Sequence, residues 1–292
     1  MSMHDLKQNR HHHHHHHQQH QQHQRPCVLV FAGHDPSGGA GIHADIEAIA
    51  AQGAHALTVI TALTTQDNDR VFASDAVASE LILKQADCLA AKMPISVIKI
   101  GLIAHAQQAA AIAAWIASYR AQALAQGRAV AVVLDPVLAS GHGDTLQSDG
   151  VVQDAAEFLA ALIAQADLVT PNLVELERFA PNVFEWVEQA QSLFSLGAAQ
   201  VLLKGGHGHG VTVVNRWLRA DRSDVLQWQW TRLEGEFHGS GCTLAAAIAG
   251  QLAQGKNMEA AMFLAQEYVQ HSLENAYAIS DGQAIPARSQ RA

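Results

Sequence analysis

The run Val130-Ala131-Val132-Val133-Leu134 is apolar at every position and leads directly into Asp135 and Pro136. A continuous apolar run of this length is typical of a strand that is buried on both faces of a parallel sheet. The Ala-rich stretch 106–126 precedes it and ends at Gly127, and a glycine just past a helical run favours the left-handed cap conformation. A long helix followed by a buried strand predicts an α/β fold.

The same alternation recurs from residue 26 onward. Apolar, β-branched runs predict strands over 27–32, 56–63, 95–101, 129–135, 167–170 and 200–204, with a hairpin over 211–218 and 225–231. Ala-rich runs predict helices over 41–52, 76–91, 106–126, 150–166, 184–196, 240–254 and 257–278. Strands and helices that alternate in this way predict a three-layer α/β domain with a mostly parallel central sheet flanked by helices.

Composition excludes several classes of partner. Among 292 residues, 18 are Lys or Arg and 27 are Asp or Glu, and the formal net charge is −9. This balance, without a basic stripe, argues against a nucleic-acid partner and against a membrane surface. No run reaches the roughly 20 apolar residues of a membrane span. Three widely spaced cysteines argue against a disulfide framework and indicate a reducing, cytoplasmic location.

The two ends of the chain differ from the rest in composition. Residues 1–25 contain the run His11–His17 followed by alternating Gln and His, and such a tract is expected to be disordered. We expect a single domain over 26–283 and a flexible C-terminus over 284–292. The His/Gln tract could bind nickel or zinc, but its composition assigns it no role.

Polar residues gather where the predicted strands end. In parallel sheets, ligands bind outside the carboxyl ends of the strands, so the loops there are expected to form one site. These loops are 33–41, 64–68, 99–102, 135–137, 170–175 and 204–207, and the segment 239–242 is expected at the same edge.

The segment His238-Gly239-Ser240-Gly241-Cys242-Thr243 opens the predicted helix 240–254. Backbone amides that converge at a helix start, together with the helix dipole, bind phosphate, and a thiolate is favoured in the first helical turn. This pattern favours phosphoryl transfer, with Cys242 as a base. The alternative is a Ser N-cap on a core helix and a cysteine that only packs. Neither a Walker-type loop nor the protein-kinase loop set is present.

Taken singly, the other segments also have structural explanations. Ser37–Gly41 could be a tight strand-to-helix turn, and Asp135 could cap a turn. Glu175 could sit in a first helical turn, where the dipole favours an acid, and Lys204 could be a solvated strand end. Their order along the chain is more specific.

Seven segments in sequence resemble the hydroxymethylpyrimidine/phosphomethylpyrimidine kinases of thiamine biosynthesis, members of the ribokinase-like superfamily. The resemblance covers about residues 27–278 and implies a three-layer ribokinase-like domain. The segments are D-P-S-G-G-A-G-I-x-A-D (35–45), V-I-T-A-L-x-x-Q (59–66), I-K-I-G-L (98–102), L-D-P-V (134–137), T-P-N-L-x-E (170–175), L-K-G-G-H (203–207) and H-G-S-G-C-T (238–243).

The resemblance implies an ATP- and Mg²⁺-dependent kinase. It would transfer the γ-phosphate of ATP to the hydroxymethyl group of 4-amino-5-hydroxymethyl-2-methylpyrimidine, and then a second phosphate to the monophosphate. The amides of Gly239, Ser240 and Gly241 would stabilise the transferring phosphoryl group. Cys242 would accept the proton of the substrate hydroxyl, provided that the helix start and nearby cations lower the pKa of its thiol.

The resemblance also implies a pocket for the pyrimidine ring. Gln66 carries both a donor and an acceptor, which suits the edge of an aminopyrimidine. Asp35 and Ala40 would close one side of the pocket, and Leu102 and Val137 would form its apolar walls.

A third group of residues would hold ATP and metal. Asn172 and Glu175 resemble the superfamily's magnesium and phosphate motif, in which the carboxylate holds Mg²⁺ through water. Asp135 would assist there, and Lys204 and Thr243 would lie close to the nucleotide. Members of this family commonly form homodimers, so a homodimer is expected.

Several residues depart from the family pattern. His43 stands where Gln is usual, Leu102 stands where Met is common, and the stretch 138–144 lacks a lysine. Glu234 and Glu236 precede the segment Gly239–Cys242, which we call the phosphate loop. Their charges are expected to weaken ATP binding unless they face solvent or metal.

Two other functions compete with pyrimidine phosphorylation. A pyridoxal kinase would act on a similar hydroxymethyl heteroaromatic ring, and a non-catalytic paralogue would bind the pyrimidine as a sensor. Trp217, Trp228 and Trp230 are expected to shield a face of the sheet, with stacking on adenine as the alternative.

Overall fold

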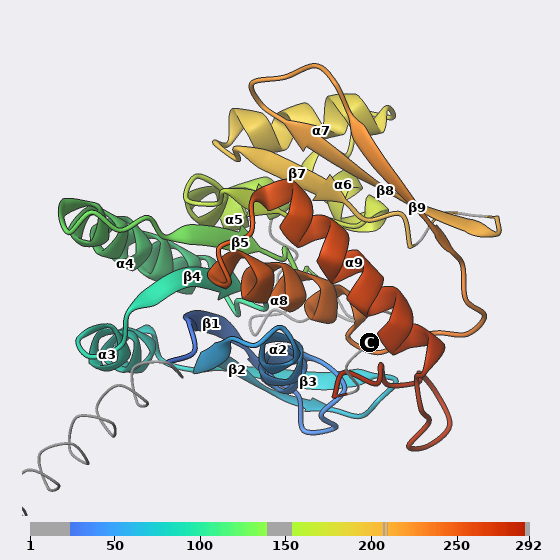
Figure 1. Ribbon diagram of the computed structural model, residues 1–292, viewed down its shortest axis with the longest axis horizontal. Coiled ribbons are helices and arrows are strands. Elements are labelled where there is room, and N and C mark those ends of the chain that lie inside the picture. Colours follow the sequence, from blue (N-terminus) through green and yellow to red (C-terminus); the bar gives the residue numbers. More distant parts are fainter. Residues whose placement is uncertain (1–23, 139–153, 207, 209, 290–292) are drawn as a thin grey trace, which may run out of the picture.

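The computed structural model describes residues 24–138, 154–206, 208 and 210–289. Within them, one sheet of nine strands runs in the order β3-β2-β1-β4-β5-β6-β7-β8-β9 (Figure 1). The strands are β1 (Cys27–His34), β2 (His55–Gln66), β3 (Val71–Ala76), β4 (Ile95–Ile100), β5 (Ala131–Leu134), β6 (Leu168–Val169), β7 (Gln200–Leu203), β8 (Thr212–Arg219) and β9 (Leu226–Thr231).

The six strands from β2 to β7 are parallel neighbours, and the sheet becomes antiparallel only at its ends. β3 pairs antiparallel with β2 at one edge, and the β8–β9 hairpin continues antiparallel from β7 at the other. The carboxyl ends of the parallel strands therefore face one side of the molecule, where their loops meet.

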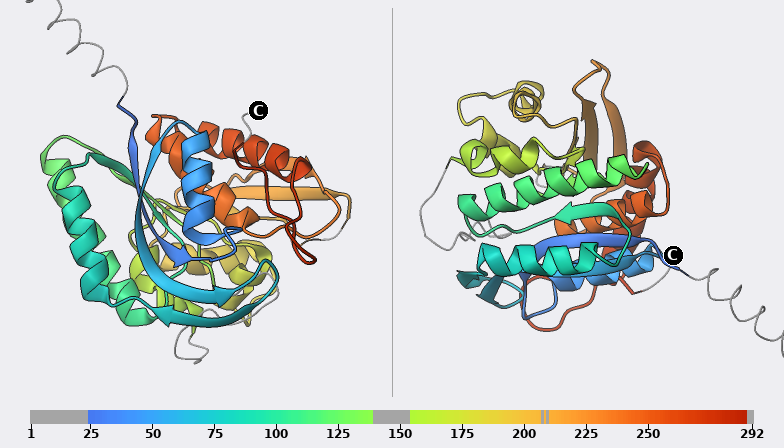
Figure 2. Two further views of the ribbon diagram at one scale, coloured as in Figure 1. Left: turned by 90° about the horizontal axis from the view of Figure 1, so that it is seen from below. Right: turned by 90° about the vertical axis from the view of Figure 1, so that its left-hand side faces the viewer.

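Helices cover both faces of the sheet (Figures 1 and 2). One face packs against α3 (Ser79–Ala90), α4 (Ala106–Ala125), α5 (Ala155–Ile163), α6 (Leu173–Phe179) and α7 (Trp186–Ser195). The other packs against α2 (Gly41–Ala51), α8 (Ser240–Ala253) and α9 (Met258–Glu274). The predicted three-layer α/β architecture is confirmed.

β1 shows why the apolar runs have no polar face. Leu29 and Phe31 lie in the core under α3 and α4, whereas Val28 and Val30 lie in the core under α2 and α8. All four side chains are fully buried. Because side chains alternate across a strand, a strand covered on both faces must be apolar throughout.

The structure contains two elements, β3 and α6, that the sequence does not predict. β3 is an edge strand with no fully buried residue. Its sequence, which includes Phe72, Ser74 and Asp75, shows neither a continuous apolar run nor a regular alternation of apolar and polar residues. α6 has only seven residues, too few to display a helical period, and its first three fall within the predicted loop 170–175. The last helix ends at Glu274, four residues before the predicted end.

The C-terminal segment is packed, and the expectation of a flexible end over 284–292 is wrong for its described residues 284–289. Ile285, Ala287 and Arg288 are buried there. Single β-bridges join Ala284 to Phe237 and Ile285 to Tyr277. The His/Gln tract falls in residues 1–23, outside the described residues. Among the helices that the structure describes, none is both long and apolar enough to cross a bilayer.

Candidate active site

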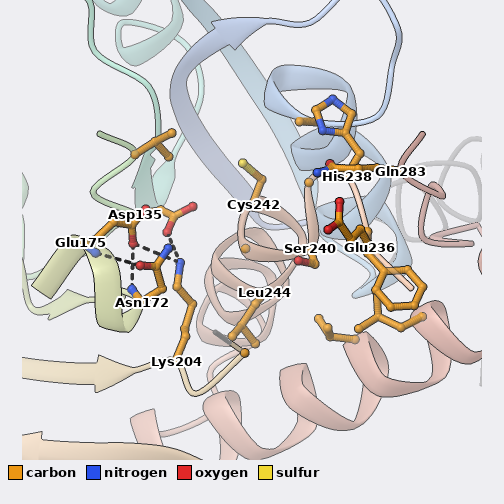
Figure 3. Close-up of a pocket in the computed structure, with 18 of the residues that line it drawn as sticks. Asp135, Asn172, Glu175, Lys204, Glu236, His238, Ser240, Cys242, Leu244 and Gln283 are labelled. Carbon is orange, nitrogen blue, oxygen red and sulfur yellow. Dashed lines mark hydrogen bonds and ion pairs between the residues drawn. The ribbon is translucent and has the colours of Figure 1, made fainter. Parts of the chain in front are cut away.

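A cavity of about 770 Å³ opens at the carboxyl ends of the parallel strands (Figure 3). The structure brings to it every residue that the sequence reading singled out for catalysis, substrate, nucleotide or metal, with the exception of Thr243. These lining residues are Asp35, Ala40, Gln66, Leu102, Asp135, Val137, Asn172, Glu175, Lys204, Gly239, Ser240, Gly241 and Cys242.

The glycine-rich loop leads into α8 through a left-handed turn. Gly239 is the N-cap residue, with φ of 74°, and a Cβ there would collide with the carbonyl oxygen of Gly39. Ser240 is the first helical residue, so the alternative of a Ser N-cap is wrong, and no side chain caps this end. The amides of the first helical turn have no acceptor within their helix, so they are suited to binding an anion.

The Cys242 thiol is less acidic than we expected. Burial raises its pKa to about 11, and the negative charges of Asp135 and Asp45 add to that effect. The ammonium of Lys99 opposes it, as does a hydrogen bond from the Gly41 backbone. The lowered pKa on which a role as base was conditional is therefore not found, because burial outweighs the nearby cation, and the thiol form predominates at neutral pH.

Lys99 forms a fully buried ion pair with Asp45. The ammonium on β4 lies 2.8 Å from Oδ1 of Asp45 on α2, and neither side chain is exposed to solvent. Burial alone would lower the pKa of Lys99, but the attraction of Asp45 and Cys242 raises it. Both residues lie within the family motifs, but the sequence assigns neither of them a role. The sequence signal for the pair is a lysine inside an otherwise apolar strand.

A second buried charge cluster joins the ends of β5 and β7 to the start of α6. Nζ of Lys204 lies 2.7 Å from Oδ1 of Asp135 and 3.8 Å from Oε2 of Glu175. Burial favours the neutral form of Asp135, but the two lysines, Lys204 and Lys99, hold its pKa below the ordinary value. Burial raises the pKa of Glu175 to about 7, against the attraction of Lys204.

Asn172 and Glu175 form a capping box at the start of α6. Oδ1 of Asn172 accepts from the Glu175 amide at 2.8 Å, and the Asn172 amide donates to Oε2 of Glu175 at 2.7 Å. The first-turn explanation of Glu175 thus holds, and the same geometry fixes its carboxylate beside Lys204 (Figure 3).

Asp35 shapes the loop after β1. Its carboxylate accepts from the amides of Ser37 at 2.8 Å and Ala40 at 2.7 Å, and it lies 2.8 Å from Nε2 of His238. Although burial opposes it, bonding to His238 and Ser37 lowers the pKa of Asp35. His238 is a site residue that was not predicted from the sequence. Its place directly before Gly239 was the available signal.

Another part of the cavity lining combines one amide side chain with an apolar cluster. Nε2 of Gln66 donates to Oγ1 of Thr64 at 2.7 Å, which orients the carboxamide at the end of β2. Leu102 packs with Val137 in a small apolar cluster beside it. A planar ring would contact apolar atoms on its face and an amide at its edge.

The tryptophans divide between two environments. Trp217 is 5% exposed and stacks on Trp228 with ring centroids 6.3 Å apart, as expected for side chains that shield the sheet. Trp230 lines the cavity, and its indole nitrogen donates to Oε1 of Gln266 at 2.9 Å.

The structure also shows where most of the residues that depart from the family pattern lie. Glu234 and Glu236 are exposed, and of the two only Glu236 lines the cavity. His43 is exposed on α2. The stretch without the lysine falls almost entirely in residues 139–153, outside the described residues. Thr243 is fully buried, and its hydroxyl donates to the carbonyl oxygen of Gly239 at 2.7 Å, away from the cavity.

Comparison with known proteins identifies relatives of this site. Residues 35–287 match the family model described as phosphomethylpyrimidine kinase. A hydroxymethylpyrimidine/phosphomethylpyrimidine kinase of Rhizobium meliloti is 33% identical over 262 residues, which cover 88% of this chain and 93% of the relative. A thiamine biosynthesis bifunctional protein of Geobacter sulfurreducens is 35% identical over 270 residues, and the chain spans only 51% of its length.

Solved structures share the fold. A phosphomethylpyrimidine kinase from Clostridium difficile superimposes with a TM-score of 0.69 at 29% identity, covering 85% of this chain and all of the other. A pyridoxal kinase from Bacillus subtilis, solved with ADP, gives a TM-score of 0.76 at 22% identity over 91% of this chain and 98% of the other. The expected ribokinase-like fold is confirmed.

Proposed function

The chain belongs to the phosphomethylpyrimidine kinase family, and from this we propose that it phosphorylates 4-amino-5-hydroxymethyl-2-methylpyrimidine and its monophosphate with ATP, in thiamine biosynthesis. One observation carries the proposal. The amide loop Gly239–Cys242 and the Gln66 wall open into a single cavity, with buried cations beside the loop. A phosphoryl donor and a small aromatic acceptor can therefore meet in that cavity.

The phosphoryl group is held by backbone and by charge. The amides of Gly239, Ser240 and Gly241 point at the developing negative charge, and the N-terminus of α8 adds its dipole. Lys204 is adjacent, because a Cβ on Gly241 would lie 3.1 Å from its Nζ. This preorganised positive environment stabilises the transition state of phosphoryl transfer.

The carboxylates of Asp135 and Glu175 suit Mg²⁺. In the described part of the chain no three acidic, His or Cys side chains converge on a metal position. Mg²⁺ does not need such a cage, since it is usually bound through one or two carboxylates together with substrate phosphates. The two carboxylates both line the cavity and fit this mode. When bound, the ion neutralises phosphate charge and orients the triphosphate.

Cys242 serves as the proton acceptor. The hydroxymethyl oxygen attacks the γ-phosphorus, the bond from phosphorus to the β,γ-bridging oxygen breaks, and ADP leaves with the electron pair. The hydroxyl proton passes to the thiolate form of Cys242, which becomes the thiol. Lys99 favours that thiolate, although burial keeps most of the population as thiol at neutral pH.

The pyrimidine ring is recognised between Gln66 and the apolar pair Leu102 and Val137. The carboxamide oxygen of Gln66 accepts from the 4-amino group, while one N–H of its nitrogen donates to Thr64 and orients the amide. Asp35 and Ala40 close the side of the pyrimidine pocket next to the phosphate loop. Asn172 and Lys204 contact the nucleotide phosphates.

We assign this activity to one kinase domain that starts near residue 26 and includes the packed segment to residue 288. We also propose a cytoplasmic homodimer without a nucleic-acid partner. Phe72 on the edge strand β3 is 69% exposed and Leu63 on β2 is 49% exposed, which supports an interface at this edge. Light scattering after size-exclusion chromatography measures the molar mass of the protein in solution and so tests the homodimer.

Acceptor comparison tests the function. The protein with ATP and Mg²⁺ is assayed with the hydroxymethylpyrimidine, its monophosphate and pyridoxal, and kcat/KM is expected to be highest for the pyrimidines. Turnover of pyridoxal alone would support the second candidate, a pyridoxal kinase. Tight pyrimidine binding without any turnover would identify a non-catalytic paralogue, for which Glu236 at the cavity rim is the motivating feature.

A further inference from the structure

Arg288 is fully buried near the C-terminal end of the described chain. Its residue is 1% exposed and is among the largest fully buried side chains. It is not among the residues that line the cavity. A guanidinium removed from water must be compensated by hydrogen bonds or by charge, so its partners indicate what it holds in place.

The partners of Arg288 belong to both loops that flank the reaction centre. Nη2 donates to the carbonyl oxygen of His238 at 3.3 Å and to that of Gly39. Nε donates to Oγ1 of Thr243 at 2.8 Å, and Nη1 lies 3.4 Å from Oε2 of Glu47. One side chain therefore ties the loop after β1 to the phosphate loop and to α2.

Thr243 extends this hold to Gly239. Its hydroxyl accepts from Arg288 and donates to the carbonyl oxygen of Gly239, at 2.7 Å. The carbonyls of two successive peptide groups, those of His238 and Gly239, thus point to the side on which Arg288 lies.

The orientation of these carbonyls fixes the orientation of the amides. In a planar trans peptide, the C=O and the following N–H point in opposite directions. The N–H groups of Gly239 and Ser240 are therefore directed away from Arg288, and both residues line the cavity. The Thr243 amide also donates to the Gly239 carbonyl, at 2.9 Å, whereas the His238 carbonyl accepts directly from Arg288, so Arg288 acts most directly on the Gly239 amide and supports the Ser240 amide through Thr243.

The chain after α9 holds Arg288 in position. We call residues 283–288 the C-terminal strap. The Ala284 amide donates to the Glu236 carbonyl at 2.9 Å, and the His238 amide donates to the Ala284 carbonyl at 2.9 Å. The Tyr268 hydroxyl donates to the carbonyl oxygen of Arg288 at 2.8 Å.

We propose that Arg288 is a positioning residue for phosphoryl transfer, and that the C-terminal strap belongs to the active-site machinery. Arg288 contacts neither substrate nor nucleotide and acts by aligning the Gly239 and Ser240 amides. The proposal rests on the proposed kinase function for its kinetic consequence, and on the hydrogen bonds alone for its structural one.

The test compares Arg288→Met, Arg288→Lys and Arg288→Ala with a matched control, Arg120→Met. Arg120 is also bonded to a backbone carbonyl, that of Gln165 at 2.8 Å, but it lies on α4 away from the cavity. We expect Arg288→Met to lower kcat at least about 10-fold, since misplacing such donors is costly. The KM for the pyrimidine should change by less than about 3-fold, because the pyrimidine pocket is not altered. Added guanidinium should restore part of the kcat of Arg288→Ala but leave Arg120→Met unchanged.

A second readout does not depend on kinase activity. Hydrogen exchange of the amides of 238–243, and the rate of alkylation of Cys242, should both rise in Arg288→Met and in Arg288→Lys relative to Arg120→Met. If Arg288→Met does not fold, Arg288→Lys and guanidinium rescue of Arg288→Ala carry the test. Unchanged kcat and unchanged exchange in the folded variants would overturn the proposal. An inactive wild type would instead overturn the kinase function and leave the exchange result to judge Arg288.

Discussion

Nζ of Lys204 lies 2.7 Å from Oδ1 of Asp135, and the same ammonium lies against Gly241 in the first turn of α8. The pair joins the acidic side of the cavity to the phosphate loop. Because both groups are largely buried, each depends on the other for its charge.

Substitution of Lys204 should affect stability and activity separately. Lys204→Met removes the ion-pair partner of the buried Asp135 and leaves it only the more distant charge of Lys99 and the Thr170 hydroxyl, which should cost about 3 kcal/mol of unfolding free energy. The double variant Lys204→Met with Asp135→Leu should recover most of that stability and none of the activity. Urea denaturation and kcat measure the two effects. Full activity in either variant would contradict a role beside the phosphoryl group.

The pH dependence of the rate tests Cys242. With a thiol pKa of about 11, the thiolate fraction should rise about tenfold per pH unit below that value. The kcat of the wild type should therefore climb between about pH 7.5 and 9.5, and Cys242→Ala should show a low, flat profile. Cys88→Ala removes an exposed thiol and is the matched control. The same slope in Cys242→Ala and wild type would remove Cys242 from the proton transfer.

Asp35 predicts a loss of stability in acid. Its pKa is lowered in the folded protein, so its contribution is complete above the unfolded value of about 3.9 and disappears as pH falls through the folded value. The difference in unfolding free energy between wild type and Asp35→Asn should be about 1–2 kcal/mol at pH 7 and should shrink below about pH 4. Thermal or urea unfolding across this range measures it. A difference that grows in acid would have the wrong sign.

Substitution of Gln66 should affect binding of the pyrimidine acceptor and not binding of ATP. Gln66→Leu keeps the volume but loses the hydrogen bond to the 4-amino group, which should raise the KM for the pyrimidine about 10- to 100-fold. The KM for ATP should stay within about 2-fold, since Gln66 is placed against the pyrimidine ring and not against the nucleotide phosphates. Equal changes for both substrates would indicate general disruption of the site.

The fold was predictable wherever strands are buried on both faces. Val28 to Phe31 are apolar because each side chain enters one of two cores, and that pattern needs no tertiary information. β3 and α6 were not predictable in the same way. An edge strand keeps one side in solvent, and α6 is defined by the capping box of Asn172 and Glu175 rather than by an apolar period.

The site was predictable to the extent that it follows strand ends. The rule that parallel strands present their carboxyl ends together collected residues from Asp35 to Cys242 in one cavity. The strand-end rule could not predict the role of Arg288 or the raised pKa of Cys242. Arg288 reaches the loop across 45 residues from Thr243, and the acidity of Cys242 depends on burial that no local sequence reveals.

The central claim is that this cavity transfers the γ-phosphate of ATP to the hydroxymethyl oxygen of the aminopyrimidine. Phosphorus-31 NMR of a reaction with the hydroxymethylpyrimidine, ATP and Mg²⁺ tests it most directly, because it identifies the bond that forms. We predict a phosphate monoester coupled to the methylene protons, followed by a diphosphate, at the rate at which ADP appears. Consumption of ATP to inorganic phosphate with no ester signal would contradict the claim.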